Sequence, residues 1–324
     1  MGVKLAWVAG ATAAAVVVTA AADAVRREDA PEPPAATTAI EDREELAAAL
    51  RDMGASGELV LHDGGCGEIR LALPSLETAT PELACPPIGA RSPAGDLVAR
   101  CVDGRIEVVS ETTGEVEWFD RGCVPAWTPD GALTAAYGGH VIRLRPCASF
   151  PCIAIPVGEL ERAARLHPAV PDRTARVRAL VDGVAWITDT RAAVAISIRV
   201  GAPVDLGGVG TIAFFEDGRL LPTPTPQPQL RNIGLPLAAS PRGTYVTQTA
   251  DIILRADGSL LTLPDHLRDA RALAWSPDER FLALATRFAV VILPVASLER
   301  FDRTGGGLRS VTILQPAADL SWRP

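Results

Sequence analysis

The residues of this sequence with the most evident chemistry are its six cysteines. An even number of cysteines favours disulfides in a domain that lies outside the cytoplasm. Cys147 and Cys152 bracket Ala-Ser-Phe-Pro between two strand-like runs, a span that suits a disulfide across a hairpin. A cysteine metal site is the poorer alternative, because the sequence lacks the CxxC pairs and neighbouring histidines that zinc sites use.

The other residue types that could carry catalysis are scattered. The four histidines (His62, His140, His167 and His266) form no HExxH or HxH group, so we expect them on the surface or in loops. No GxSxG elbow marks a serine nucleophile, and no facing pair of carboxylates suits glycoside hydrolysis. We therefore identify no catalytic, cofactor-binding or metal-ligating residues and predict no cofactor.

A strand–turn–strand unit recurs along the chain, and we expect it to position any functional side chains. Its fullest copy is AWSPD at residues 274–278, followed by the apolar run Phe281–Ala285. Ser-Pro-Asp suits a type I turn, because proline presets φ at the second position and Ser and Asp can bond to the local backbone. Other copies begin near residues 88, 125, 184 and 237, and a last copy at residues 319–324 stops inside its turn.

Each full copy is followed by two further strand-like runs, and four strands per unit are typical of a propeller blade. The truncated last copy supplies only an inner strand, while residues 56–61 and 68–73 supply a second and a third strand. One blade would then combine both ends of the domain and close the ring, which removes open sheet edges. Six starts predict an all-β, six-bladed β-propeller. Seven blades of about 41 residues are the alternative that the length allows.

The repeated Trp-Ser/Thr-Pro-Asp start, followed by Leu-x-Ala, resembles the WD40-like (PD40) repeats of TolB-like six-bladed propeller proteins. WTPDG at residues 127–131 and WSPD at residues 275–278 carry the resemblance, which covers residues ~56–324. It implies the fold and says little about function.

The blade assignment also suggests how the other four cysteines pair. Cys66 and Cys101 lie near the turn between the second and third strands of a blade. Cys85 and Cys123 lie at the start of the next blade's inner strand, on the same propeller face. We predict Cys66–Cys85 and Cys101–Cys123 disulfides. The competing pair is Cys85–Cys101, which would leave Cys66 and Cys123 without a partner.

Four tryptophans, Trp127, Trp186, Trp275 and Trp322, share one repeat position. Tryptophan is strongly buried on average, so we expect these side chains to pack between neighbouring blades. A platform on which a sugar stacks is the alternative.

The N-terminal segment predicts export. Residues 5–22 are an uncharged run of 18 residues after Lys4, so residues 1–25 are expected to be a signal-anchor or transmembrane helix. Cleavage near Ala24, with secretion of the remainder, is the alternative. A Pro-rich linker at 26–39 and a short amphipathic helix at 40–55 would lead into a propeller domain at 56–324. The propeller would lie outside the cytoplasm, with the membrane contacted through the N-terminal helix.

Two charged connections are candidates for a partner-binding rim beside the channel mouth. Their residues are Glu159, Glu161, Arg162, Arg165 and His167 in one connection and Asp265, His266 and Arg268 in the other. Solvated caps are the alternative for both. Residues 297–308, which contain three consecutive glycines, are expected to form a loop.

The net charge of −8 argues against sequence-independent binding of nucleic acid, which needs clustered cations. These observations together predict a non-catalytic, extracytoplasmic interaction or ligand-sensing module of the cell envelope. It would bind a protein or a small ligand at one propeller face. An envelope enzyme acting on a small molecule or glycan at the channel mouth is the alternative.

Overall fold

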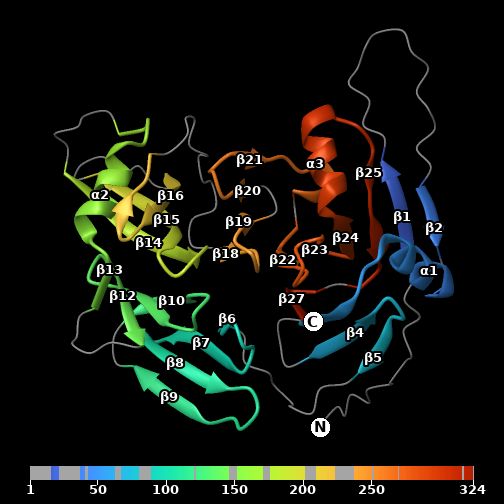
Figure 1. Cartoon of the computed structure of the whole chain (residues 1–324), viewed down its shortest axis with the longest axis horizontal. Helices are drawn as coiled ribbons and strands as arrows, with labels where there is room; N and C mark the ends of the chain where they lie inside the picture. Colours follow the sequence, from blue (N-terminus) through green and yellow to red (C-terminus); the bar gives the residue numbers. More distant parts are fainter. Residues whose placement is uncertain are drawn as a thin grey trace, which may run out of the picture.

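The strands form six antiparallel sheets around a common axis (Figure 1). The computed structural model describes residues 16–21, 37–40, 43–62, 67–79, 89–119, 122–145, 152–170, 176–200, 209–222, 237–249, 252–268, 270–315 and 317–323. In Figure 1 the colours pass around the ring from blue β4 through green β8 and β12 to orange β20 and red β24. The described strands therefore form a six-bladed β-propeller, as the repeat predicted.

Four blades are continuous in sequence, and each begins with its inner strand. Blade 2 contains β6 (Ala90–Arg91), β7 (Leu97–Val102), β8 (Arg105–Ser110) and β9 (Val116–Phe119). Blade 3 contains β10 (Cys123–Trp127), β11 (Leu133–Tyr137), β12 (His140–Arg145) and β13 (Cys152–Ile155). Blade 4 contains β14 (Val177–Trp186), β15 (Arg191–Val200), β16 (Gly210–Glu216) and β17 (Arg219–Leu220). Blade 5 contains β18 (Ala238–Ala239), β19 (Tyr245–Thr249), β20 (Ile252–Arg255) and β21 (Leu260–Leu261).

Blade 1 combines strands from distant parts of the chain. Its inner strand is β27 (Asp319–Arg323), and its other strands are β3 (Gly57–His62), β4 (Glu68–Leu73) and β5 (Glu77–Ala79). β27 pairs antiparallel with β3, and the register runs from Asp319 opposite His62 to Arg323 opposite Glu58. Figure 1 shows the chain's C-terminus beside this blade.

Blade 6 carries extra strands on its outer side. It contains β22 (Ala272–Trp275), β23 (Phe281–Ala285), β24 (Val290–Pro294) and β26 (Val311–Ile313), and then β1 (Val16–Ala21) and β2 (Thr37–Ile40). A short strand, β25 (Leu308–Arg309), also pairs with β1.

β1 corrects one expectation, because residues 16–21 are extended and do not belong to an N-terminal helix. Two causes favour the strand. The run Val-Val-Val-Thr is β-branched, and β26 offers a free edge, with which Val16 and Val17 pair opposite Ile313 and Thr312. The end of the expected linker is likewise strand β2. The remaining residues of the expected 1–25 helix and 26–39 linker lie outside the described part of the chain. Among the helices that the structure describes, none is long and apolar enough to cross a membrane.

The helices fill gaps beside the blades. α1 (Arg43–Met53) falls within the amphipathic helix expected at 40–55, and its Leu46 and Leu50 are fully buried in a core shared with Leu59 and Phe281. α2 (Val157–Arg165) joins blade 3 to blade 4, and a 3₁₀ turn, η1 (Asp265–Leu267), joins blade 5 to blade 6.

α3 (Val295–Thr304) corrects the loop expected at 297–308. The helix forms because it can bury Val295 and Leu298 against blade 6, where Phe301 also packs. Gly305, with φ of 64°, adopts the left-handed conformation that ends a helix, so the first of the three glycines is a helix stop.

The side chains of the repeated Ser/Thr-Pro motif stabilise the turn between the first and second strands of a blade through hydrogen bonds. The Ser276 hydroxyl donates to Asp278 Oδ1 (2.7 Å) and accepts the Phe281 amide (2.9 Å). Ser240 accepts the Tyr245 amide at 2.9 Å in the same way. Both serines are buried, so the hydroxyl satisfies the first amide of the second strand inside the protein. The motif positions strands and takes no part in the cavity described below.

The four repeat tryptophans each contact the preceding blade. Trp127 Nε1 donates to the Ala90 carbonyl, and Trp186 Nε1 donates to Thr134 Oγ1, both at 2.9 Å. Trp275 stacks on Tyr245 of blade 5 with ring centroids 4.7 Å apart. Trp322 stacks on Phe281 of blade 6 at 6.1 Å, which continues the pattern across the junction between blades 6 and 1.

A matched pair of substitutions measures the inter-blade hydrogen bond. Trp186→Phe should lower the free energy of unfolding by about 1–3 kcal/mol, because it leaves buried Thr134 without one of its partners. Trp275→Phe should cost less, since Trp275 Nε1 is buried without a hydrogen-bond partner among the described residues. Urea unfolding of both variants checks this. Equal losses would show that volume alone matters at this position.

Candidate functional site

A cavity of about 670 Å³ lies on the propeller axis and is lined by residues from all six blades. Its size is in the range of pockets that take small molecules. The inner strands leave this space because many of the residues that line it are small: Gly89, Ala90, Ala126, Gly183, Ala185, Ala238, Ala239 and Ala272.

Polar side chains gather at one end of the cavity. Five blades contribute one each: His62, Arg100, Asp182, Gln248 and Arg271, which we call the mouth residues. Their common level follows from the register of the strands. His62 ends β3 opposite the first residue of β27, and Arg100 and Gln248 lie one residue beyond the Ala99 and Thr247 positions that pair with Ala90 and Ala238.

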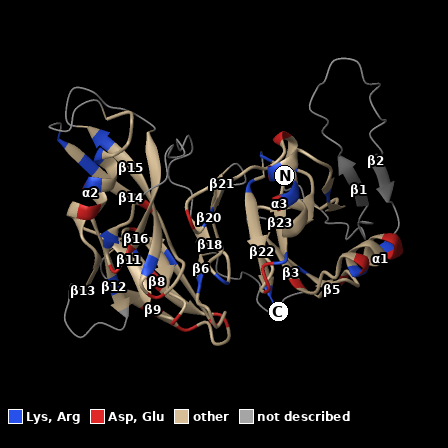
Figure 2. Ribbon diagram, turned by 45° about the horizontal axis from the view of Figure 1, so that its top comes forward, with Lys and Arg blue, Asp and Glu red and all other residues tan. Residues whose placement is uncertain are grey.

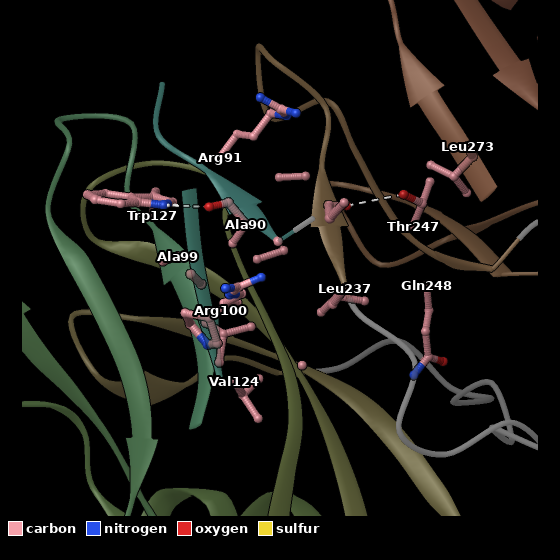
Figure 3. Close-up of a pocket in the computed structure, with 18 of the residues that line it drawn as sticks. Ala90, Arg91, Ala99, Arg100, Val124, Trp127, Leu237, Thr247, Gln248 and Leu273 are labelled. Carbon is pink, nitrogen blue, oxygen red and sulfur yellow. Dashed lines mark hydrogen bonds between the residues drawn. The ribbon is translucent and has the colours of Figure 1, made fainter. Parts of the chain in front are cut away.

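Two of the mouth residues share a repeat position. Asp182 lies four residues before Trp186, and Arg271 lies four residues before Trp275. Figure 3 shows Arg100 and Val124 on one side of the cavity and Thr247 and Gln248 on the other, with Leu237 between them.

Two mouth residues are held by acidic neighbours. His62 is 3% exposed, and its Nδ1 lies 3.7 Å from Glu68 Oε2. Glu68 Oε1 also accepts a 2.6 Å hydrogen bond from Arg70 Nε. Arg100 pairs with Glu107. The positive charge of Arg100 is therefore balanced within the protein. The burial of His62 corrects the expectation of a surface histidine.

The other three mouth residues keep unused polar groups. Gln248 is 6% exposed, and both its Oε1 and Nε2 are buried without a hydrogen-bond partner among the described residues. Asp182 accepts a hydrogen bond from Ser197 Oγ but has no ion pair with a described residue. Arg271 is exposed at the rim, and its side chain has neither a hydrogen bond nor an ion pair within the described ranges. These are the groups that a ligand could engage.

Burial raises the pKa of the Asp182 carboxyl above its ordinary value of 3.8. The folded state then binds this proton more tightly than the unfolded state, so the stability contributed by Asp182 falls as pH rises from 3.8 through the raised pKa. Asp182→Asn should therefore unfold at a higher temperature than the parent at pH 7, and the difference should vanish near pH 3. Paired melting curves across this range test the sign, and a variant that is less stable at pH 7 would contradict it.

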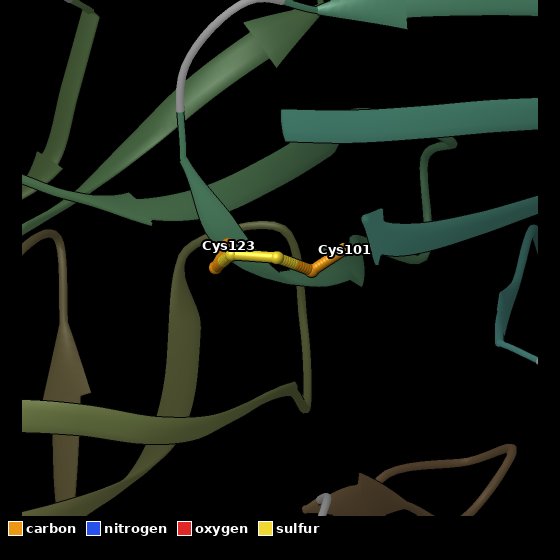
Figure 4. The surroundings of a disulfide bond; sticks show 2 residues. All are labelled: Cys101 and Cys123. Carbon is orange, nitrogen blue, oxygen red and sulfur yellow. A yellow bond between two sulfur atoms is a disulfide. The ribbon is translucent and has the colours of Figure 1, made fainter. Parts of the chain in front are cut away.

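The Cys101–Cys123 disulfide joins blades 2 and 3 beside the mouth (Figure 4), with Cα atoms 5.1 Å apart. It is the pairing that the blade assignment predicted. Cys152 is also disulfide-bonded, and Cys147, its expected partner, lies outside the described residues. Cys66 and Cys85 lie outside them as well, so the Cys66–Cys85 pair stays a prediction.

The charged connection containing α2 is hydrogen-bonded to blade 4. Glu159 Oε2 accepts the Leu220 amide at 2.8 Å and pairs with Arg162 Nη2 at 2.6 Å. Figure 2 shows basic and acidic residues on α2. His167 is only 1% exposed, and burial lowers its pKa below 6.5, so it is not the exposed rim residue that we expected.

The second charged connection is held by its own contacts. Arg268 Nη1 pairs with Asp265 Oδ1 at 2.9 Å, and Arg268 Nε donates to the Leu263 carbonyl at 3.2 Å. None of the eight residues expected to form the rim (Glu159, Glu161, Arg162, Arg165, His167, Asp265, His266 and Arg268) lines the cavity. Whether any of them binds a partner stays a prediction.

Sequence reasoning missed the mouth residues, because they are far apart in the chain and none has a distinctive neighbour. The sequence did contain one signal for two of these residues. Four residues before the repeat Trp, two blades carry a charged residue (Asp182 or Arg271) where two others carry the uncharged Cys123 or Ala318. Within the described ranges, no group of three or more His, Cys, Asp or Glu could hold a metal ion.

No protein-family model matches the chain, and no curated protein matches it. One similar solved structure is the hydrazine synthase of Kuenenia stuttgartiensis, with a TM-score of 0.45 and 13% identity, covering 80% of this chain and 84% of that chain. Another is the β-propeller domain of Cps50 (Swd1) from Myceliophteria thermophila, with a TM-score of 0.45 and 12% identity, covering 83% of this chain and 90% of that chain. At this level of similarity neither structure informs the function of this chain.

Proposed function

We propose that the protein is a non-catalytic, extracytoplasmic interaction module that binds its ligand or partner at the mouth of the axial cavity. The observation that carries this is the buried Gln248 amide, which lines the cavity with both polar atoms unpartnered among the described residues. Leaving such a group unpaired costs about 1–3 kcal/mol, and a bound molecule that pairs with it would recover this.

The disulfides support a location outside the cytoplasm, since such bonds persist mainly in oxidising compartments. We also propose that pairing of β27 with β3 closes the ring, which would hold the mouth residues of blades 6 and 1 at a fixed separation.

The intact mass of the mature protein shows whether the N-terminal segment is retained or cleaved. Cleavage near Ala24 would remove the residues of β1.

Proximity labelling in the native envelope tests the proposed function, with the labelling enzyme fused to the full chain. Arg271→Glu reverses an exposed charge at the mouth, and Arg300→Glu on α3 reverses an exposed charge away from it. We expect envelope partners that Arg271→Glu loses and Arg300→Glu retains. The absence of enriched partners, or their equal retention by both variants, would overturn the proposal.

A further inference from the structure

Opposite charges flank the buried amide at the mouth of the cavity. Asp182 belongs to blade 4, Gln248 to blade 5 and Arg271 to blade 6, so the order around the ring is acid, amide, base. Asp182 and Arg271 each lie four residues before the repeat Trp of their blade, and both line the axial cavity. The three groups therefore form a polar arc across three successive blades.

The two charged groups of the arc form no ion pair with each other, although the nearby Arg199 acts to lower the pKa of Asp182. No ion pair within 4.0 Å joins Asp182 to Arg271, and neither forms an ion pair with another described residue. Ten ion pairs between arginines and carboxylates occur elsewhere in the described part of the chain. Ser321 of β27, on the wall of the same cavity, adds a buried hydroxyl oxygen without a partner among the described residues. Two residues of this wall, Gln248 and Ser321, therefore carry buried polar atoms that a ligand could pair with.

We propose that the mouth binds a short peptide with free termini. Arg271 would hold the terminal carboxylate, Asp182 the terminal ammonium, and Gln248 would pair with a peptide group between them. The inference rests on the proposed function and names the chemical class of ligand for the same site.

The chemistry of the three groups selects this class. A guanidinium pairs with a carboxylate through charge-assisted hydrogen bonds, and a carboxylate does the same with an ammonium. A side-chain amide presents one donor and one acceptor to a peptide N–H and C=O. A free amino acid lacks the amide, a phosphate would bring negative charge to Asp182, and a neutral sugar would leave both charges unpaired.

The rest of the cavity suits an extended chain with small side chains. Blades 4, 5 and 6 line it with Gly183, Ala185, Ala238, Ala239 and Ala272 beside the larger Leu237 and Leu273. The small residues leave width, and these side chains offer few further polar contacts. An extended peptide advances about 3.3–3.6 Å per residue, so a length series reports the separation between the two charged groups.

Isothermal titration calorimetry with alanine, dialanine, trialanine and tetraalanine at pH 7 tests the proposal on the full chain. We expect one length to bind best. N-acetylation or C-terminal amidation of that peptide should weaken binding about tenfold or more, because each removes one charged contact. Arg300→Gln is the matched control and should bind as the parent does.

Two variants separate the roles of the charged groups. Asp182→Asn should bind the free and the N-acetylated peptide equally, and Arg271→Gln should bind the free and the amidated peptide equally. Both should keep the parent's far-UV circular dichroism. Failure of every peptide to bind, or unchanged discrimination in these variants, overturns the inference. If Arg271→Glu still loses envelope partners in that case, the proposed function stands with a different ligand.

Discussion

Deleting residues 319–324 should lower the free energy of unfolding by about 5 kcal/mol or more. The deletion removes the inner strand of blade 1, and with it buried Leu320 and Trp322. Burial of one large apolar side chain contributes about 1.5–3 kcal/mol, and the loss of Trp322 also exposes Phe281 of blade 6. The edge of β3 would be left without its partner, which favours aggregation.

Thermal unfolding of the truncated protein measures this effect. A synthetic peptide of residues 317–324 should restore part of the lost stability, because it can pair with β3 in the native register. The same peptide carrying Trp322→Ser is the matched control and should restore less. An unchanged melting temperature after truncation would contradict the role of β27 in joining the two ends of the ring.

Replacing both cysteines of the Cys101–Cys123 disulfide by serine should lower the free energy of unfolding by about 3 kcal/mol. The bond closes a loop of 22 residues, and such a cross-link restricts the unfolded chain by roughly this amount. The two residues also tie the inner strand of blade 3 to the second strand of blade 2 beside the mouth. We therefore expect weaker ligand binding together with the lower stability.

Guanidinium unfolding of the parent and the double variant gives the free-energy difference. Reductant is the control: it should lower the stability of the parent more than that of the variant, although Cys152 makes both sensitive. Peptide mapping without reduction gives an independent check. Recovery of Cys85 linked to Cys101 would show that the pairing in solution differs from that in the structure.

The repeat alone determined the architecture of this protein. Strand, turn and strand are encoded locally, by proline and hydroxyl residues such as Pro277 and Ser276 and by apolar runs such as Phe281–Ala285. Because each blade repeats these local instructions, the number of copies predicts the number of sheets. The position of the repeat tryptophans likewise anticipated contacts between blades.

Tertiary structure decided which elements formed outside the repeat. α3 exists because blade 6 buries its apolar side, although its sequence ends in a glycine run that reads as a loop. β1 is a strand because β26 offers it a free edge, whereas the same apolar residues would suit a helix in a membrane.

The mouth of the cavity was also decided only by folding. Asp182, Gln248 and Arg271 are separated by 66 and 23 positions in the chain and line one cavity because blades 4, 5 and 6 share one axis. Their unused hydrogen-bonding groups are visible only when burial and partners are known, since an isolated Gln or Arg has no sequence pattern. The sequence by itself therefore determined the repeated blade, and only the arrangement of the blades around one axis brought these residues to one cavity.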